Sequence, residues 1–398
     1  MRHIFRFLFR YQKSYFALAG LSVFHLLISF SRGALTTYFP KYLEGFIPNL
    51  GLVAAILALP WALNILSDVL IGDLAEYINK RRLIIFGLIL LAIVGIIYYL
   101  AQSVWVLVFG LVLYGFAVDL YWIPTNSYLI GISPKKQDSE YYAIFDSLGS
   151  LGWTLGPTVA GFIIGSFLPK NLFLFFSTMC LITLLYVLFV MRIPDVKHVK
   201  RHSIKKYLLG FLNLRRLKRG AKISLFLTAA ATLWDDLLWL ITPLYLFSLD
   251  LQPAFIGFVL TMLALPYLLF QVPAGFWEDR NGKATIILPA LALIGVSLIA
   301  FGMFENIIVF LVAAFVLSTC SAFLGPALGG ILIDNTTPKE REHTASLRTF
   351  LCNIATITGF IAGGLIAEYL GFVQVYYILA AFIILLGFAA HFMHAEDC

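Results

Sequence analysis

The chain has 398 residues, of which 61% are hydrophobic and only 12% are charged, and its formal net charge is +7. A soluble domain carries about 25% charged residues, so this composition excludes an ordinary soluble protein. The positive charge alone would suit nucleic-acid binding, but the basic residues follow a membrane topology, which excludes nucleic acid as a partner.

Long apolar runs recur along the whole chain, and each is long enough to cross a hydrocarbon core of about 30 Å. Glycine and proline inside these runs are tolerated because neighbouring helices satisfy the freed backbone groups. The sequence therefore predicts an all-α membrane protein with twelve transmembrane helices, at residues 14–38, 49–71, 83–101, 104–132, 141–168, 171–191, 223–248, 254–277, 284–303, 307–333, 345–367 and 372–393.

The basic residues are distributed unequally between the two sides of the predicted membrane. Of 28 lysines and arginines, only Lys41 and Lys170 fall in loops on one side, and Arg32 lies inside a span. The positive-inside rule places the other side, with both termini, in the cytoplasm, and a cell membrane is the expected location. We interpret the basic N-terminus as the start of an uncleaved first helix, because no cleavage site follows it.

The sequence repeats itself at an offset of 203 residues, so that Pro40 returns as Pro243 and Gly156 returns as Gly359. In a membrane protein, such tandem halves usually serve to move a solute between them. The prediction is an N-terminal six-helix bundle at 1–192, a basic cytoplasmic linker at 193–222 and a C-terminal six-helix bundle at 223–398. The linker is either an amphipathic helix on the anionic cytoplasmic leaflet or a solvated connection.

Two segments at equivalent places in the repeat share glycines, acids and basic residues. They follow the second and the eighth span and contain Gly72, Asp73, Glu76 and Arg81, and Gly275, Asp279, Arg280, Gly282 and Lys283. Both resemble the G-x-L-a-D-R-x-G-R-K loop of the major facilitator superfamily, although the first copy has Glu76 for Asp and Asn79 for Gly. The resemblance implies a cytoplasmic latch, to which we add Asp68; the alternative is a generic turn that obeys the positive-inside rule. We interpret Asp146, Asp334 and Arg348 as charges of a cytoplasmic gate.

The fifth span carries closely spaced small residues around a proline, namely Gly152, Gly156, Pro157 and Gly161. Small residues four apart let two helix backbones approach closely, and the proline permits a kink. The pattern is similar to the fifth-helix motif of antiporters in the same superfamily, with Ala160 where that motif often has glycine. It therefore indicates export, or else helix packing alone.

Four charged residues lie inside predicted spans and away from their cytoplasmic ends: Arg32 in span 1, Asp119 in span 4, and Asp235 and Asp236 in span 7. A charge near the bilayer centre costs about 2.5–3.5 kcal/mol, so such residues usually face a cavity or a partner. The family resemblance implies that spans 1, 4, 7 and 10 line a central cavity. We therefore expect these residues to bind solute or carry protons, although Asp119 paired structurally with Arg32 would look the same in sequence.

Helical spacing places other polar residues on the same faces as these charges. The stripes contain His25 and Arg32 in span 1, Asp119 and Asn126 in span 4, and Asp235, Trp239 and Thr242 in span 7. His25 is either part of a proton relay or a hydrogen-bonding packing residue. Asp235 and Asp236 point about 100° apart, so only one is expected to face the cavity. The tryptophans within spans form either an aromatic wall or part of the core.

The resemblance to the major facilitator superfamily extends over essentially the whole chain and implies a secondary transporter that works by alternating access. We expect proton-coupled antiport that exports a small amphipathic solute. The alternatives are a proton symporter that imports a sugar or other metabolite, and a sensor or scaffold that no longer transports. No phosphate-binding loop, HExxH or CxxC pattern occurs, so no enzyme, cofactor or metal site is expected, and a monomer suffices.

Overall fold

The computed structural model describes residues 2–133, 138–191 and 217–395, so most of the predicted linker lies outside the described residues. Almost all of the described part is helical. It contains eleven helical segments long and apolar enough to cross a membrane, and a shorter apolar helix, Phe372–Phe388. The predicted all-α membrane architecture is confirmed.

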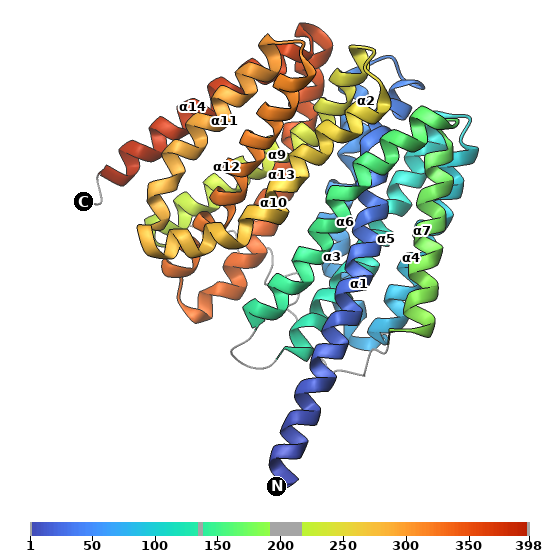
Figure 1. Cartoon of the computed structure of the whole chain (residues 1–398), viewed down its shortest axis with the longest axis vertical. Coiled ribbons are helices and arrows are strands. Elements are labelled where there is room, and N and C mark those ends of the chain that lie inside the picture. Colours follow the sequence, from blue (N-terminus) through green and yellow to red (C-terminus); the bar gives the residue numbers. More distant parts are fainter. Residues whose placement is uncertain (1, 134–137, 192–216, 396–398) are drawn as a thin grey trace. The chain divides into compact units, whose positions relative to one another are not determined.

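The chain forms two compact units, each built from long helices (Figure 1). Unit 1 comprises Met1–Leu35 and Leu63–Arg201, and unit 2 comprises Thr36–Ala62 and His202–Cys398. Unit 1 holds most of α1 (Arg2–Glu44) and α3 (Leu59–Tyr77), with α4 (Lys80–Leu100), α5 (Val104–Ile132), α6 (Asp138–Ser166) and α7 (Asn171–Phe189). Unit 2 holds α2 (Leu50–Leu57), α9 (Arg219–Ser248), α10 (Pro253–Asn281), η2 (Lys283–Ile286), α11 (Ile287–Met303), α12 (Ile307–Asp334), α13 (Pro338–Leu370) and α14 (Phe372–Ala395).

Helix α4 packs against both α5 and α7 in unit 1, and Figure 1 shows it beside α7. Glycines on α4 allow both contacts. A Cβ added to Gly87 would lie 2.9 Å from the carbonyl oxygen of Ala117, and one added to Gly95 would lie 2.8 Å from that of Phe173. The hydroxyl of Ser177 also donates to the carbonyl of Ala92 across the second contact, at 2.7 Å. Close backbone packing of this kind replaces the hydrophobic effect as the main attraction between helices in lipid.

The small residues of the fifth predicted span bring α6 against α1, as their spacing predicts. A Cβ on Gly156 would lie 2.7 Å from the carbonyl carbon of Gly33, and one on Gly152 would overlap the carbonyl oxygen of Leu26. Gly33 in turn approaches the backbone of Trp153. Pro157 and Gly161 are buried in the same helix, which continues through the proline.

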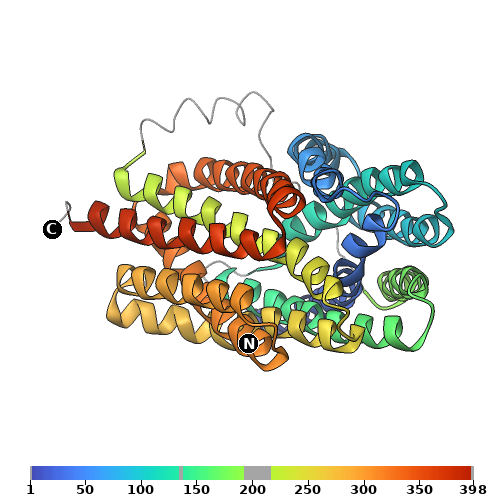
Figure 2. The same ribbon diagram turned by 90° about the horizontal axis from the view of Figure 1, so that it is seen from above.

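In unit 2, α13 packs against α9 by means of two glycines, one of which has a glycine counterpart in the first copy of the repeat. Gly359, the counterpart of Gly156, meets Leu233, and Gly363 meets Leu237. Helix α12 packs against both α10 and α11, and Figure 2 shows α14, in red, alongside α11. The second copy of the sequence thus repeats the helix contact of the first copy with different side chains.

The short helix α2 belongs to the first copy of the repeat but packs on α13 of unit 2. The backbone N–H of Leu50 donates to Oε2 of Glu368 at 2.6 Å, and Gly364 lies directly against Ala54. The predicted span at 49–71 is in fact two helices that meet at Ala58. Pro60 explains the break, because proline has no backbone N–H to donate to a preceding turn.

The segments expected to be loops after spans 2 and 8 are mostly helical, which corrects the sequence interpretation. Helix α3 continues to Tyr77 and α10 continues to Asn281. The chain turns at repeat-equivalent residues of different type. Gly282 has φ of +94°, a conformation that favours glycine, whereas Asn79 has φ of −53° and caps α4 by accepting a hydrogen bond from the N–H of Arg81.

Candidate functional site

Arg32 lies inside α1 and is held by aromatic residues from two other helices of unit 1. Its Nε donates to the hydroxyl of Tyr114 at 3.1 Å, and its Nη1 donates to the hydroxyl of Tyr121 at 2.9 Å. The guanidinium carbon also lies 5.7 Å from the ring centroid of Trp153, within cation–π range. The cation is therefore oriented by neutral groups on α5 and α6.

Asp119 is buried on α5 and accepts a hydrogen bond from the hydroxyl of Ser67 on α3. It is two residues before Tyr121, so its side chain leaves the helix about 200° away from that tyrosine. Tyr121 faces Arg32, which places Asp119 on the opposite face of α5. Among the described residues, Arg32 therefore does not pair with Asp119, and this alternative from the sequence is wrong.

His25 lies two helical turns before Arg32, on the same face of α1, and its ring packs between aromatic rings. It stacks on Phe145 with centroids 4.2 Å apart and lies 5.3 Å from the ring of Trp122. The hydroxyl of Ser29 is 3.4 Å from its Nδ1, and the side chain of His25 fills the space beside Gly149. This environment is that of a hydrogen-bonding packing residue.

Asn126, the other polar residue of the predicted stripe on α5, donates to the carbonyl of Trp122 in its own helix at 3.0 Å.

The two adjacent acids of α9 point toward different helices, as their 100° separation requires. Asp235 accepts a hydrogen bond from the hydroxyl of Tyr267 on α10, with an O–O distance of 2.9 Å. Asp236 accepts one from the hydroxyl of Thr356 on α13. Each carboxyl group thus has a neutral partner, and within the described chain neither acid forms an ion pair.

The other polar and aromatic residues of α9 differ in how far they are buried. Trp239 is half-buried, whereas the hydroxyl of Thr242 is buried and accepts a hydrogen bond from Tyr376 of α14 at 3.2 Å. Trp234 is only 1% exposed, which makes it a core residue rather than part of an aromatic wall.

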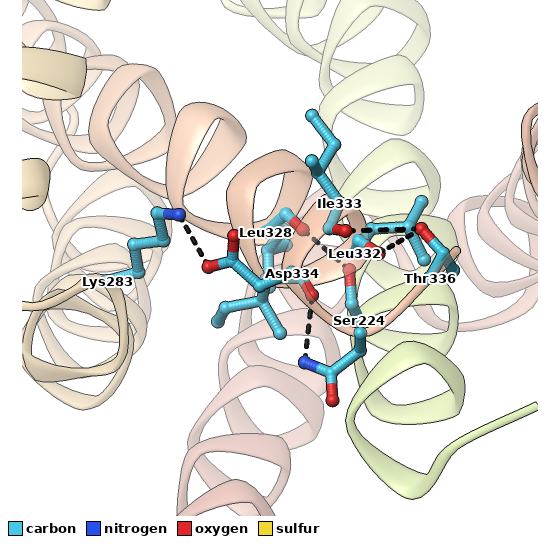
Figure 3. Close-up of polar contacts among 9 residues, drawn as sticks. Ser224, Lys283, Leu328, Leu332, Ile333, Asp334 and Thr336 are labelled. Carbon is cyan, nitrogen blue, oxygen red and sulfur yellow. Dashed lines mark hydrogen bonds and ion pairs between the residues drawn. The ribbon is translucent and has the colours of Figure 1, made fainter. Parts of the chain in front are cut away.

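The basic residues of the two predicted latches bind the ends of helices in their own units. Nη2 of Arg81 donates to the carbonyls of Val187 and Leu188 at the end of α7, at 3.1 and 2.9 Å. Lys283 forms an ion pair with Asp334 at the end of α12, with Nζ and Oδ2 2.6 Å apart (Figure 3). Cations favour helix C-termini because the last carbonyls carry a partial negative charge.

The remaining latch and gate residues are only partly described. The side chains of Asp68, Asp73, Glu76 and Asp279, and the surroundings of Gly72, lie outside the described residues. Arg280 and Arg348 are exposed, Asp146 is half-buried on α6, and Gly275 has open space around it. Their joint action as a gate stays a prediction.

A sequence model of the Major Facilitator Superfamily matches residues 21–234 and 224–397, which together cover most of the chain. The chain belongs to the Major Facilitator Superfamily. The suspected resemblance is thereby confirmed, and the protein is a member of a family of multi-pass membrane transporters.

Relatives and solved structures agree with this assignment. An uncharacterised transporter of the superfamily from Methanocaldococcus jannaschii is 21% identical over 82% of this chain and 84% of its own length. The multidrug resistance protein MdtG of a Rahnella strain is 22% identical over 78% of this chain and 75% of its own. The crystal structure of a mutant of the nucleoside transporter NupG shares the fold with a TM-score of 0.82 at 14% identity, over 95% of this chain and 99% of its own.

Sequence reasoning missed the hydroxyl groups that hold the intramembrane charges. Tyr114 and Tyr121 are seven residues apart and so share one face of α5, a signal that could have identified them as a pair. Ser67 and Thr356 gave no such signal, because hydroxyls in membrane helices commonly bond to the preceding turn, as Thr154 does to Ser150.

Replacing Lys283 with glutamine is expected to lower the free energy of unfolding by less than about 1 kcal/mol, because the ion pair with Asp334 is partly exposed. Thermal unfolding of the detergent-solubilised protein would measure this loss, which should disappear in about 1 M salt, where charges are screened within about 3 Å. Arg280→Gln is the matched control on the same segment. A larger loss that persists in high salt would contradict this view of the pair.

Proposed function

We propose that this member of the superfamily is a proton-coupled antiporter that exports a small amphipathic solute by alternating access. Membership in a transporter family supports the movement of a solute, and the relatives named as multidrug or quinolone resistance proteins favour export. In this proposal the protein lies in the cell membrane as a monomer, both termini are cytoplasmic, and the basic loops face the anionic leaflet. The predicted bundles at 1–192 and 223–398 would rock about the solute path.

The observation that carries the proposal is the setting of the acids on α9. A carboxyl group held by a hydroxyl can gain or lose a proton without first breaking an ion pair. Asp235 with Tyr267, and Asp236 with Thr356, both have this arrangement. Hydrogen bonds to a hydroxyl also suit both protonation states, since a hydroxyl can donate to a carboxylate and accept from a carboxylic acid. Such a site can bind and release the coupling proton without a rearrangement of helix α9.

Alternating access requires helix contacts that form in one state and break in another. The packing of α2 on α13 is a candidate, because it joins residues of the first sequence copy to residues of the second. The contact depends on one hydrogen bond to Glu368 and on glycines at the point of closest approach. Separation of this contact would break the hydrogen bond between the N–H of Leu50 and Glu368, and both residues are partly exposed, so water can replace the lost partner.

Vesicles that contain the purified protein test the proposal directly. We expect an imposed pH gradient to drive a fluorescent amphipathic dye against the flow of protons, and the reverse gradient to reverse its movement. Anionic fluorescein and cationic ethidium serve as dyes, and protein-free vesicles are the control. Movement of the dye with the protons would indicate the symporter instead, and no movement of either dye under any gradient would favour the non-transporting sensor.

A further inference from the structure

Arg32 is a permanent charge inside a membrane helix, and its partners in the described chain are all neutral. Two tyrosine hydroxyls and one indole ring surround the guanidinium. A guanidinium carries five N–H donors and is not deprotonated in proteins, so its charge is constant. The hydrogen bonds to Tyr114 and Tyr121 use one donor on Nε and one on Nη1. One donor on Nη1 and both donors on Nη2 therefore have no acceptor among the described residues.

This arrangement is costly unless a counter-charge is supplied. An arginine at the centre of a membrane helix is costly on insertion scales, and such residues are usually paired. Tyrosine hydroxyls and an aromatic face stabilise the cation without cancelling its charge. An anion from outside the unit would supply the missing partner, and the planar fork of arginine binds carboxylates and related anions through two parallel hydrogen bonds.

The surrounding residues fix the direction in which the open donors point. Tyr114 and Tyr121 come from one face of α5 and hold Nε and Nη1, so the guanidinium plane is set by two points on a single helix. The ring of Trp153 on α6 lies against the guanidinium group of Arg32. Arg32 nevertheless keeps an intermediate exposure, whereas Ser29 and Ser31 beside it on α1 are buried. The open Nη1 and Nη2 donors are the groups that an anionic ligand would bind.

We propose that Arg32 is the solute-binding group of this transporter and that the solute is an amphipathic anion, with a carboxylate or sulfonate attached to an apolar body. The anionic group would bind the open Nη1 and Nη2 donors. The apolar body would contact aromatic residues such as Trp153. This inference rests on the proposed function, since it names the class of solute that the same site binds.

A binding experiment on the purified full-length protein tests the charge preference without any variant. The probes are 2-naphthoate, its uncharged counterpart 2-naphthamide and the cation 2-naphthylmethylamine, and the readout is thermal stabilisation as a function of probe concentration. We expect 2-naphthoate to bind at least about tenfold more tightly than the other two, because a charge-assisted bidentate contact is stronger than a hydrogen bond between neutral groups. Equal binding of all three probes, preference for the amine, or no stabilisation by 2-naphthoate would overturn the inference.

Variants then assign the preference to Arg32. We expect Arg32→Gln to abolish the preference and Arg32→Lys to retain part of it, because lysine keeps the charge but not the fork. Tyr121→Phe keeps the cation and releases one of its positioning bonds, so it should weaken 2-naphthoate binding several-fold. Lys170→Gln is the matched control, since Lys170 is an exposed cation that lies 5.0 Å from the ring centroid of Tyr99. Unchanged 2-naphthoate binding in folded Arg32→Gln or Arg32→Lys protein would overturn the assignment.

Failure of this inference is distinguishable from failure of the proposed function. If ethidium moves against the proton flow in vesicles while 2-naphthoate shows no preferential binding, the antiporter stands and the anionic solute class is wrong. If 2-naphthoate binds through Arg32 while no dye responds to a pH gradient, the anion site stands and proton coupling is wrong.

Discussion

Asp235→Asn is expected to reduce pH-driven dye movement to the level of protein-free vesicles while solute exchange without a gradient continues. Asparagine cannot bind or release a proton, so the coupling step is lost. Its side-chain oxygen still accepts the hydrogen bond from Tyr267, which should keep the change in unfolding free energy within about 1 kcal/mol. The comparison of gradient-driven movement with exchange in the same vesicles separates coupling from solute binding.

Asp236→Asn is expected to retain coupling, because the two acids differ in their packing. Asp236 bonds to Thr356 within the α9–α13 contact, where Leu233 and Leu237 meet glycines of α13 at close range. We assign it a structural role in that contact, whereas Asp235 bonds to α10. Asp250→Asn is a second control, since Asp250 is exposed just beyond the C-terminal end of α9. Wild-type coupling in Asp235→Asn, or loss of coupling only in Asp236→Asn, would contradict the assignment.

The membrane fold could be predicted because it depends on composition over long windows. Each span needs about 20 apolar residues whatever its neighbours are, so hydropathy alone locates it. The local geometry within a span was harder to predict from the sequence. The break at Ala58 follows from Pro60, yet Pro157 and Pro243 lie within continuous helices. A proline permits a break, and tertiary packing determines whether one occurs.

The charged residues of the candidate site could be predicted, but their partners could not. A charge in an apolar run is conspicuous in any sequence, which is why Arg32 and Asp235 stand out. Their partners are hydroxyls contributed by other helices, at separations of 82 and 89 residues for Arg32 and 32 residues for Asp235. Such pairs depend on how helices rotate against each other, and the hydrophobic pattern of one helix does not determine that rotation in a lipid environment.

The glycines of α6 show the opposite case, in which sequence spacing and packing correspond directly. The contact between α6 and α1 supports Trp153 and Arg32, and hence the geometry on which the anion site depends. Backbone atoms of α1 fill the space where side chains at Gly152 and Gly156 would lie. Because a backbone cannot move away as a flexible side chain can, any substitution there separates the two helices.

Gly152→Ala and Gly156→Ala are each expected to lower the free energy of unfolding by about 1–3 kcal/mol, the usual cost of overpacking a dense interior. Gly165→Ala, on the same helix, is the matched control, because a Cβ there meets nothing within 4 Å. Alanine in place of glycine should stabilise this site by about 0.5–1 kcal/mol. Unfolding in mixed detergent measures all three. If the three variants were equally stable, close backbone contact would not be what holds α6 on α1, and the orientation of Arg32 would need another cause.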